Sequence, residues 1–191
     1  MECLANTCMP EGSDPVASPS TRHVLDPTAI GIVAAHRPRA SAGLPPTVSF
    51  GSRVGGGVAW YMSFEPDWPP TDRVDRAFLI LSPPPGSVPV TKDVRLAAWR
   101  VAAPWNIDEL TYDDQPPRAP PRGVGIASST PAQIVRIDVT GIVQYWQRHP
   151  RDRHGIAVEA PRGDGPGVGF CTGAGGGDGP RLDVYVVPRA Q

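Results

Sequence analysis

The chain has 191 residues, which is enough for one sizeable domain or at most two small ones. Its formal net charge is −1, from 18 basic and 19 acidic residues, and this balance argues against a protein that binds nucleic acid through bulk charge. No apolar stretch approaches the roughly 20 residues that cross a bilayer, so the sequence predicts no membrane span. The 25 prolines and 21 glycines disfavour long helices and favour a loop-rich, mostly β domain.

The N-terminal half begins with a segment that has little to bury. Residues 1–22 are polar and contain several prolines, and they predict a flexible tail before a single domain over residues 23–191. Runs of strand-forming residues then alternate with proline and glycine. The predicted strands of this half lie at 29–33, 47–50, 58–64, 76–81 and 94–101.

The last of these strands alternates, with Leu96 and Ala98 on one face and Arg95 and Trp99 on the other. After it, the proline-rich residues 104–131 predict mostly loop.

The C-terminal half changes its period once, after a strand predicted at 134–139. The residues that then recur at helical spacing are Val139, Ile142, Val143 and Trp146. Thr140 is placed to cap this helix with its hydroxyl, and Pro150 ends it. Further strands are predicted at 155–159, 168–172 and 182–187. Many short strands with one short helix predict an all-β fold, either an antiparallel sandwich or a barrel.

The three cysteines are Cys3, Cys8 and Cys171, and their odd number excludes a framework in which every cysteine is paired within the chain. Cys3 and Cys8 lie close together in the tail, either as unpaired thiols or as a local disulfide. Two cysteines without a nearby histidine do not make a zinc site. Cys171 lies in an alternating apolar run, which predicts a buried core residue.

Six short motifs follow one another between residues 26 and 185. One is Asp138-Val139-Thr140 followed by Val143 and Trp146. The six motifs lie at 26–51, 76–81, 94–96, 105–116, 138–146 and 179–185. In their order and spacing they resemble the DNRLRE domain family.

The DNRLRE family consists of jelly-roll modules found mainly in secreted and cell-surface proteins of bacteria and archaea, and some relatives are classed as carbohydrate-binding modules. The resemblance implies a jelly-roll-like antiparallel β-sandwich with one short helix, and a secreted or cell-surface location. The chain departs from the family in a longer segment at 52–75 and in Tyr112, where the family has tryptophan. Residues 1–20 also lack the basic start and apolar run of a secretory signal.

Two tryptophans are candidate ligand-binding residues, because an exposed aromatic ring can stack on the apolar face of a sugar. Trp99 lies on the outward face of its predicted strand, and Trp68 lies between Asp67 and Pro69. The alternative for both is that they pack beneath a loop.

Arg148, Arg151 and Arg153 gather at the end of the predicted helix, where the helix dipole favours cations. They are candidate contacts for an acidic polymer such as a uronic-acid polysaccharide. The alternative is a solvated basic turn.

Four acidic residues cluster in one predicted loop: Asp108, Glu109, Asp113 and Asp114. Carboxylates can bind Ca²⁺ or serve a glycosidase as acid and base. The spacing matches no known calcium loop, so this is a weak candidate metal site, and a solvated loop is the alternative.

No nucleophile motif accompanies the four histidines, so the sequence predicts no enzyme and no cofactor, with calcium left open. The leading hypothesis is a non-catalytic binding module for a polysaccharide or other surface glycan. The alternative is a structural or adhesive surface protein that uses the sandwich for protein–protein assembly.

Overall fold

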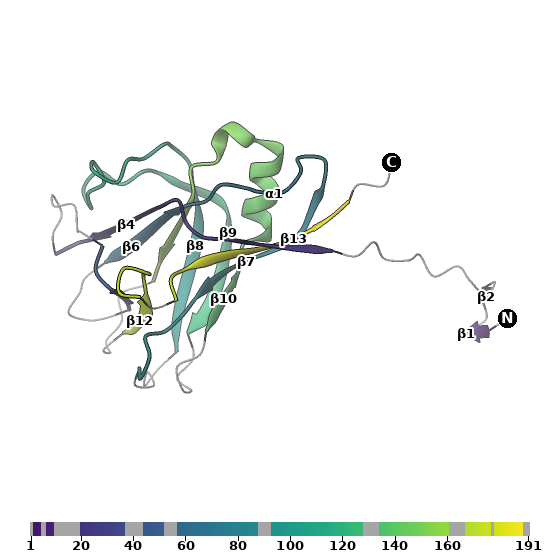
Figure 1. Ribbon diagram of the computed structural model, residues 1–191, viewed down its shortest axis with the longest axis horizontal. Coiled ribbons are helices and arrows are strands. Elements are labelled where there is room, and N and C mark those ends of the chain that lie inside the picture. Colours follow the sequence, from purple (N-terminus) through teal and green to yellow (C-terminus); the bar gives the residue numbers. More distant parts are fainter. Residues whose placement is uncertain are drawn as a thin grey trace.

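Two antiparallel β-sheets pack face to face, and one α-helix lies at an end of this sandwich (Figure 1). The computed structural model describes residues 2–4, 7–9, 20–36, 44–51, 57–87, 93–127, 134–160, 167–176 and 178–188. The predicted all-β, antiparallel sandwich with one short helix is confirmed.

The first sheet has four strands in the order β10-β7-β13-β3. Their bounds are β3 (Thr21–Leu25), β7 (Arg73–Leu81), β10 (Val135–Asp138) and β13 (Arg181–Val187). The second sheet has five strands in the order β4-β6-β11-β8-β9. Their bounds are β4 (Ala29–Ala34), β6 (Val58–Ser63), β8 (Val94–Val101), β9 (Arg118–Ala127) and β11 (Ile156–Glu159).

Strands that are far apart in sequence lie side by side in both sheets. The last strand, β13, lies between β3 and β7, and β11 lies between β6 and β8. This order, with consecutive strands mostly crossing from one sheet to the other, is a jelly-roll arrangement. The remaining strands form two separate two-stranded sheets: β5 (Thr47–Phe50) pairs with β12 (Val168–Cys171), and β1 (Glu2–Leu4) pairs with β2 (Thr7–Met9).

The core lies between the two sheets because alternate residues of each strand point inward. In β8, Leu96 and Ala98 face inward and are fully buried, whereas Arg95 is exposed. The same predicted alternation places the apolar residues Val135, Ile137, Leu182, Val184 and Val186 in the core, although Asp183, on the outward face of β13, is buried as well. Cys171 is also buried, as predicted. In the tail, the register of β1 and β2 places Cys3 opposite Cys8.

The helix α1 (Thr140–Arg148) closes one end of the sandwich, and a short 3-10 helix, η1 (Pro150–Asp152), follows it. The helix α1 contacts one strand of each sheet, β7 of the first and β9 of the second. Its buried residues are Ile142, Val143 and Trp146, as the helical spacing predicted. These side chains join the core that lies between the sheets.

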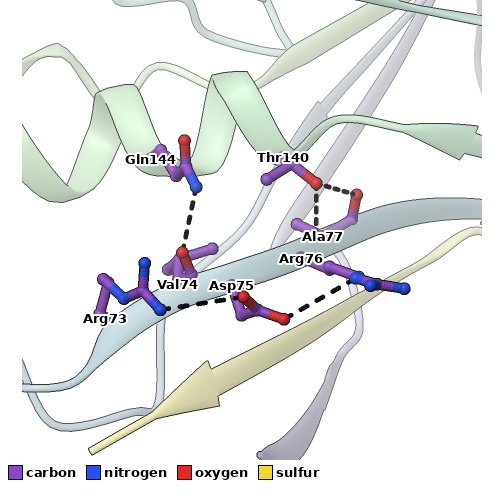
Figure 2. A network of polar contacts seen from close by, with 7 residues as sticks. All are labelled: Arg73, Val74, Asp75, Arg76, Ala77, Thr140 and Gln144. Carbon is purple, nitrogen blue, oxygen red and sulfur yellow. Dashed lines mark hydrogen bonds and ion pairs between the residues drawn. The ribbon is translucent and has the colours of Figure 1, made fainter. Parts of the chain in front are cut away.

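Hydrogen bonds fasten α1 to β7, as Figure 2 shows. The hydroxyl of Thr140 accepts a bond of 2.9 Å from the Ala77 amide, and Gln144 Nε2 donates one of 3.1 Å to the Val74 carbonyl. In the pairing with β13, Asp75 is an extra residue, so β7 bulges there. The helix side chains therefore bond to backbone groups on both sides of the bulge.

Three predictions about these elements are wrong. Thr140 is the first residue of α1 and its hydroxyl bonds to β7, so it does not cap the helix; Val139 precedes the helix without a side-chain cap. The segment predicted as loop contains the ten-residue strand β9. The strand β3 begins at Thr21, inside the segment predicted as tail. The rest of that tail, apart from β1, β2 and Ser20, lies outside the described residues.

Candidate functional site

The long connection between β8 and β9 covers half of the outer face of the five-stranded sheet. Trp105, Leu110 and Tyr112 of this connection pack on the outward side chains of β4 and β6, which include Val33 and Tyr61. Trp105 Nε1 also donates a hydrogen bond of 2.7 Å to the carbonyl of His154. This covering forms a second, smaller core outside the sandwich.

A polar seam marks the border of the covered half. The Tyr61 hydroxyl donates a hydrogen bond of 3.0 Å to Gln115 Oε1, which also accepts one of 3.0 Å from Arg118. Arg118 forms an ion pair with Glu159 on β11. Arginine, glutamine and glutamate therefore stand at the border between the covered and the open part of this sheet.

Tyr61 of this seam makes the stability of the folded chain depend on pH, and this dependence can be tested. Burial raises the pKa of the Tyr61 hydroxyl to about 12, whereas tyrosine in an unfolded chain has a pKa of about 10. The unfolded chain therefore loses this proton first, so the stabilisation is complete below pH 10 and is lost as the pH rises toward 12. We expect urea unfolding to show a loss of about 2 kcal/mol over this range. Tyr61→Phe should remove this part of the loss, and identical pH curves for the two proteins would contradict the assignment.

The other half of this face, over β8 and β9, is not covered by the connection. The register pairs Trp99 with Arg122, Ala97 with Val124, and Arg95 with Ile126. The Arg122 guanidinium lies 4.9 Å from the centroid of the Trp99 indole. A hollow of about 390 Å³ is lined by Arg95, Ala97, Trp99, Arg122, Val124, Glu159 and Ala160.

The lining of this hollow suits a ligand that is partly apolar and partly polar. Trp99 supplies a half-buried aromatic surface, and Ala97 and Val124 extend it. Arg122 and Arg95 supply guanidinium donors, and Glu159, held by Arg118, supplies a carboxylate acceptor. Sites for small ligands combine apolar walls with a few placed polar groups in this way.

The other sequence-predicted ligand residues do not line this hollow. Trp68 is half-buried and packs against the main core, with its ring centroid 6.1 Å from that of His23. At the helix end, Arg148 and Arg151 are exposed, whereas Arg153 is half-buried. Of the predicted residues, the structure therefore places only Trp99 in this hollow, among the residues that it describes.

The acidic loop residues lie in the covering connection. Glu109 and Asp114 line a separate hollow of about 250 Å³ beside Trp105. Asp108 and Asp113 are exposed on the same connection. Within the described ranges, no three His, Cys, Asp or Glu side chains come together as a group that could hold a metal ion. Calcium binding by this loop therefore stays a prediction.

Sequence reasoning missed Arg95, Arg122, Val124 and Glu159 as site residues. The signal for two of them was present, because Arg122 and Val124 alternate with glycine in the manner of a strand. The prolines before Arg122 concealed that alternation.

No protein-family model and no curated protein sequence matches the chain. Within the described residues, no helix has the length and apolar character needed to span a membrane.

Proposed function

We propose that this chain is a non-catalytic module that binds a polysaccharide or other surface glycan at the hollow around Trp99. The observation that carries the proposal is the half-covered sheet face, which leaves a tryptophan beside charged groups in an open hollow. A sugar ring has an apolar C–H face that packs on an indole, and hydroxyl edges that bond to guanidinium and carboxylate groups.

The order of the sequence motifs supports the same proposal through their resemblance to DNRLRE domains, some of which are classed as carbohydrate-binding modules. That resemblance also underlies a secreted or cell-surface location for the protein, which we propose together with the function. The jelly-roll order of the strands agrees with this resemblance.

A glycan array of the purified chain, probed with and without Ca²⁺, tests the proposal and the calcium alternative together. For a neutral glycan that binds, Trp99→Ala should weaken the affinity about tenfold, because the stacked aromatic surface is lost. Trp68→Ala is the matched control, since it removes the same side chain at a position that does not line the hollow. Absence of any glycan whose binding Trp99→Ala weakens, or equal losses in the two variants, would contradict the proposal.

One observation favours the alternative of a structural or adhesive protein. Val124 and Ile126 of β9 are 49% and 55% exposed on the same open face, and exposed apolar side chains grouped on one face are typical of contact surfaces. If the sandwich assembles there, Ile126→Asp should convert an oligomer into a monomer in light-scattering mass measurements. A wild-type chain that is monomeric at high concentration would contradict assembly through this face.

A further inference from the structure

The outer face of the other sheet carries two arginines around an aromatic pair. Phe78 on β7 and Tyr185 on β13 lie edge to face, with ring centroids 6.3 Å apart. The guanidinium of Arg136, on β10, lies 3.8 Å from the centroid of the Phe78 ring. Arg76 lies opposite Tyr185 in the strand register, and 71% of its side chain is exposed. The four side chains therefore form one surface across three neighbouring strands.

This surface is hollowed. A hollow of about 650 Å³ is lined by Ser20, Asp75, Arg76, Phe78, Arg136 and Tyr185. Its lining combines two guanidinium groups and two aromatic rings with two hydroxyls and one carboxylate. A ligand that fits all of these groups is anionic, has apolar surface, and also donates hydrogen bonds.

Neighbouring carboxylates neutralise little of the charge of these two arginines. In the part of the chain that the structure describes, no carboxylate pairs with Arg136. Asp75 lies 3.7 Å from Arg76, a long and exposed contact that is worth little (Figure 2). Asp183, the buried carboxylate of the same face, pairs with Arg22 at 2.8 Å instead. Both guanidinium groups therefore keep N–H donors for a ligand.

We infer that this hollow binds an acidic polysaccharide whose sugars carry carboxylates, with Arg76 and Arg136 as the two anchors. Stacking on Phe78 holds the plane of the Arg136 guanidinium and leaves its N–H edges to donate paired bonds to a carboxylate. Asp75 accepts hydrogen bonds from sugar hydroxyls. The inference does not depend on the Trp99 hollow, which lies on the other sheet.

The lining favours a sugar acid over an acidic peptide. Asp75 accepts hydrogen bonds and repels a second carboxylate, so a neutral donor within the same anionic ligand fits beside it. A uronic-acid residue carries hydroxyl donors beside its carboxylate, whereas the side chains of polyglutamate carry carboxylates alone.

Titration calorimetry with polygalacturonate tests the inference. Arg76→Gln and Arg136→Gln should each weaken binding about tenfold, because each removes a charged hydrogen-bond donor. Both side chains lie on the surface, so the variants should fold as the wild type does, which thermal unfolding verifies. Arg151→Gln is the matched control: it removes the same charge from an exposed arginine at the helix end and should change the affinity less than about twofold.

Poly-L-glutamate is the second probe, and it should bind at least about tenfold more weakly than polygalacturonate. The inference is wrong if polygalacturonate does not bind, if polyglutamate binds as tightly, or if Arg151→Gln weakens binding as much as Arg136→Gln. The last result would place the acidic polymer at the basic helix end instead. If polygalacturonate binds but no glycan depends on Trp99, only the proposed function is contradicted. If binding of a glycan depends on Trp99 but polygalacturonate does not bind, only this inference is contradicted.

Discussion

Trp146→Ala is expected to lower the free energy of unfolding by about 3–5 kcal/mol, the range found when a large core side chain is truncated. Its side chain is 2% exposed and lies in the core at the end that α1 closes. The loss should lie in the upper part of this range because α1 cannot shift to fill the cavity that the tryptophan side chain leaves. Thr140 and Gln144 hold the helix to the backbone of β7. Urea unfolding of the wild type and the variant measures the difference.

Two companion variants separate packing from helix formation. Arg148→Ala changes an exposed residue of the same helix and should cost less than about 1 kcal/mol. Trp146→Phe keeps an aromatic ring and should lose less stability than Trp146→Ala. If Trp146→Ala costs no more than Arg148→Ala, the end of the sandwich does not depend on this side chain.

Elements with regular apolar periodicity were predictable from the sequence. The strand β8 has its predicted bounds, and α1 lies where the helical spacing placed it, because each has one buried face, which imposes a period of 2 or 3.6 on the sequence. Leu96 and Trp146 are buried for this reason. No tertiary information was needed to place them.

Elements whose inward residues are not large and apolar were missed. In β9 the inward positions include Gly123 and Gly125, and the strand also contains Pro120 and Pro121. Each of these residues favours turns in a sequence taken alone. Pairing with β8 makes this segment a strand, and β10 of the other sheet packs against it; neither contact is visible in the local sequence.

The candidate site was predictable only in part for a similar reason. Trp99 follows from the alternation of β8, which places it on the outward face. Whether an outward residue meets solvent depends on the connection between β8 and β9, which covers Tyr61 but leaves Trp99 half-exposed. Coverage of this kind depends on where a long loop folds back, and residue periodicity carries no information about it. The aromatic pair of Phe78 and Tyr185 was missed because it joins two strands that are distant in sequence.

The glycines of β9 lie where the two sheets approach each other closely. A Cβ built on Gly123 would overlap the backbone oxygen of Asp138 on β10, and one built on Gly125 would lie 2.6 Å from a side-chain carbon of Ile137. Real Cβ atoms essentially never come so close to another atom. The absence of side chains at these positions therefore lets β9 pack against β10 and close this side of the sandwich.

Gly123→Ala should consequently lower the free energy of unfolding by about 3 kcal/mol, because the obstructing atom belongs to the backbone and the strands must separate to admit a methyl group. Gly169→Ala is the matched control, since it adds the same methyl group to a glycine of β12 whose nearest neighbours lie 3.8 Å away. It should change the stability by less than about 1 kcal/mol, because alanine is tolerated at least as well as glycine in a strand. Equal stabilities of the two variants in urea unfolding would show that β9 and β10 can separate at little cost. In that case, glycine at this position would not be what allows the sheets to meet.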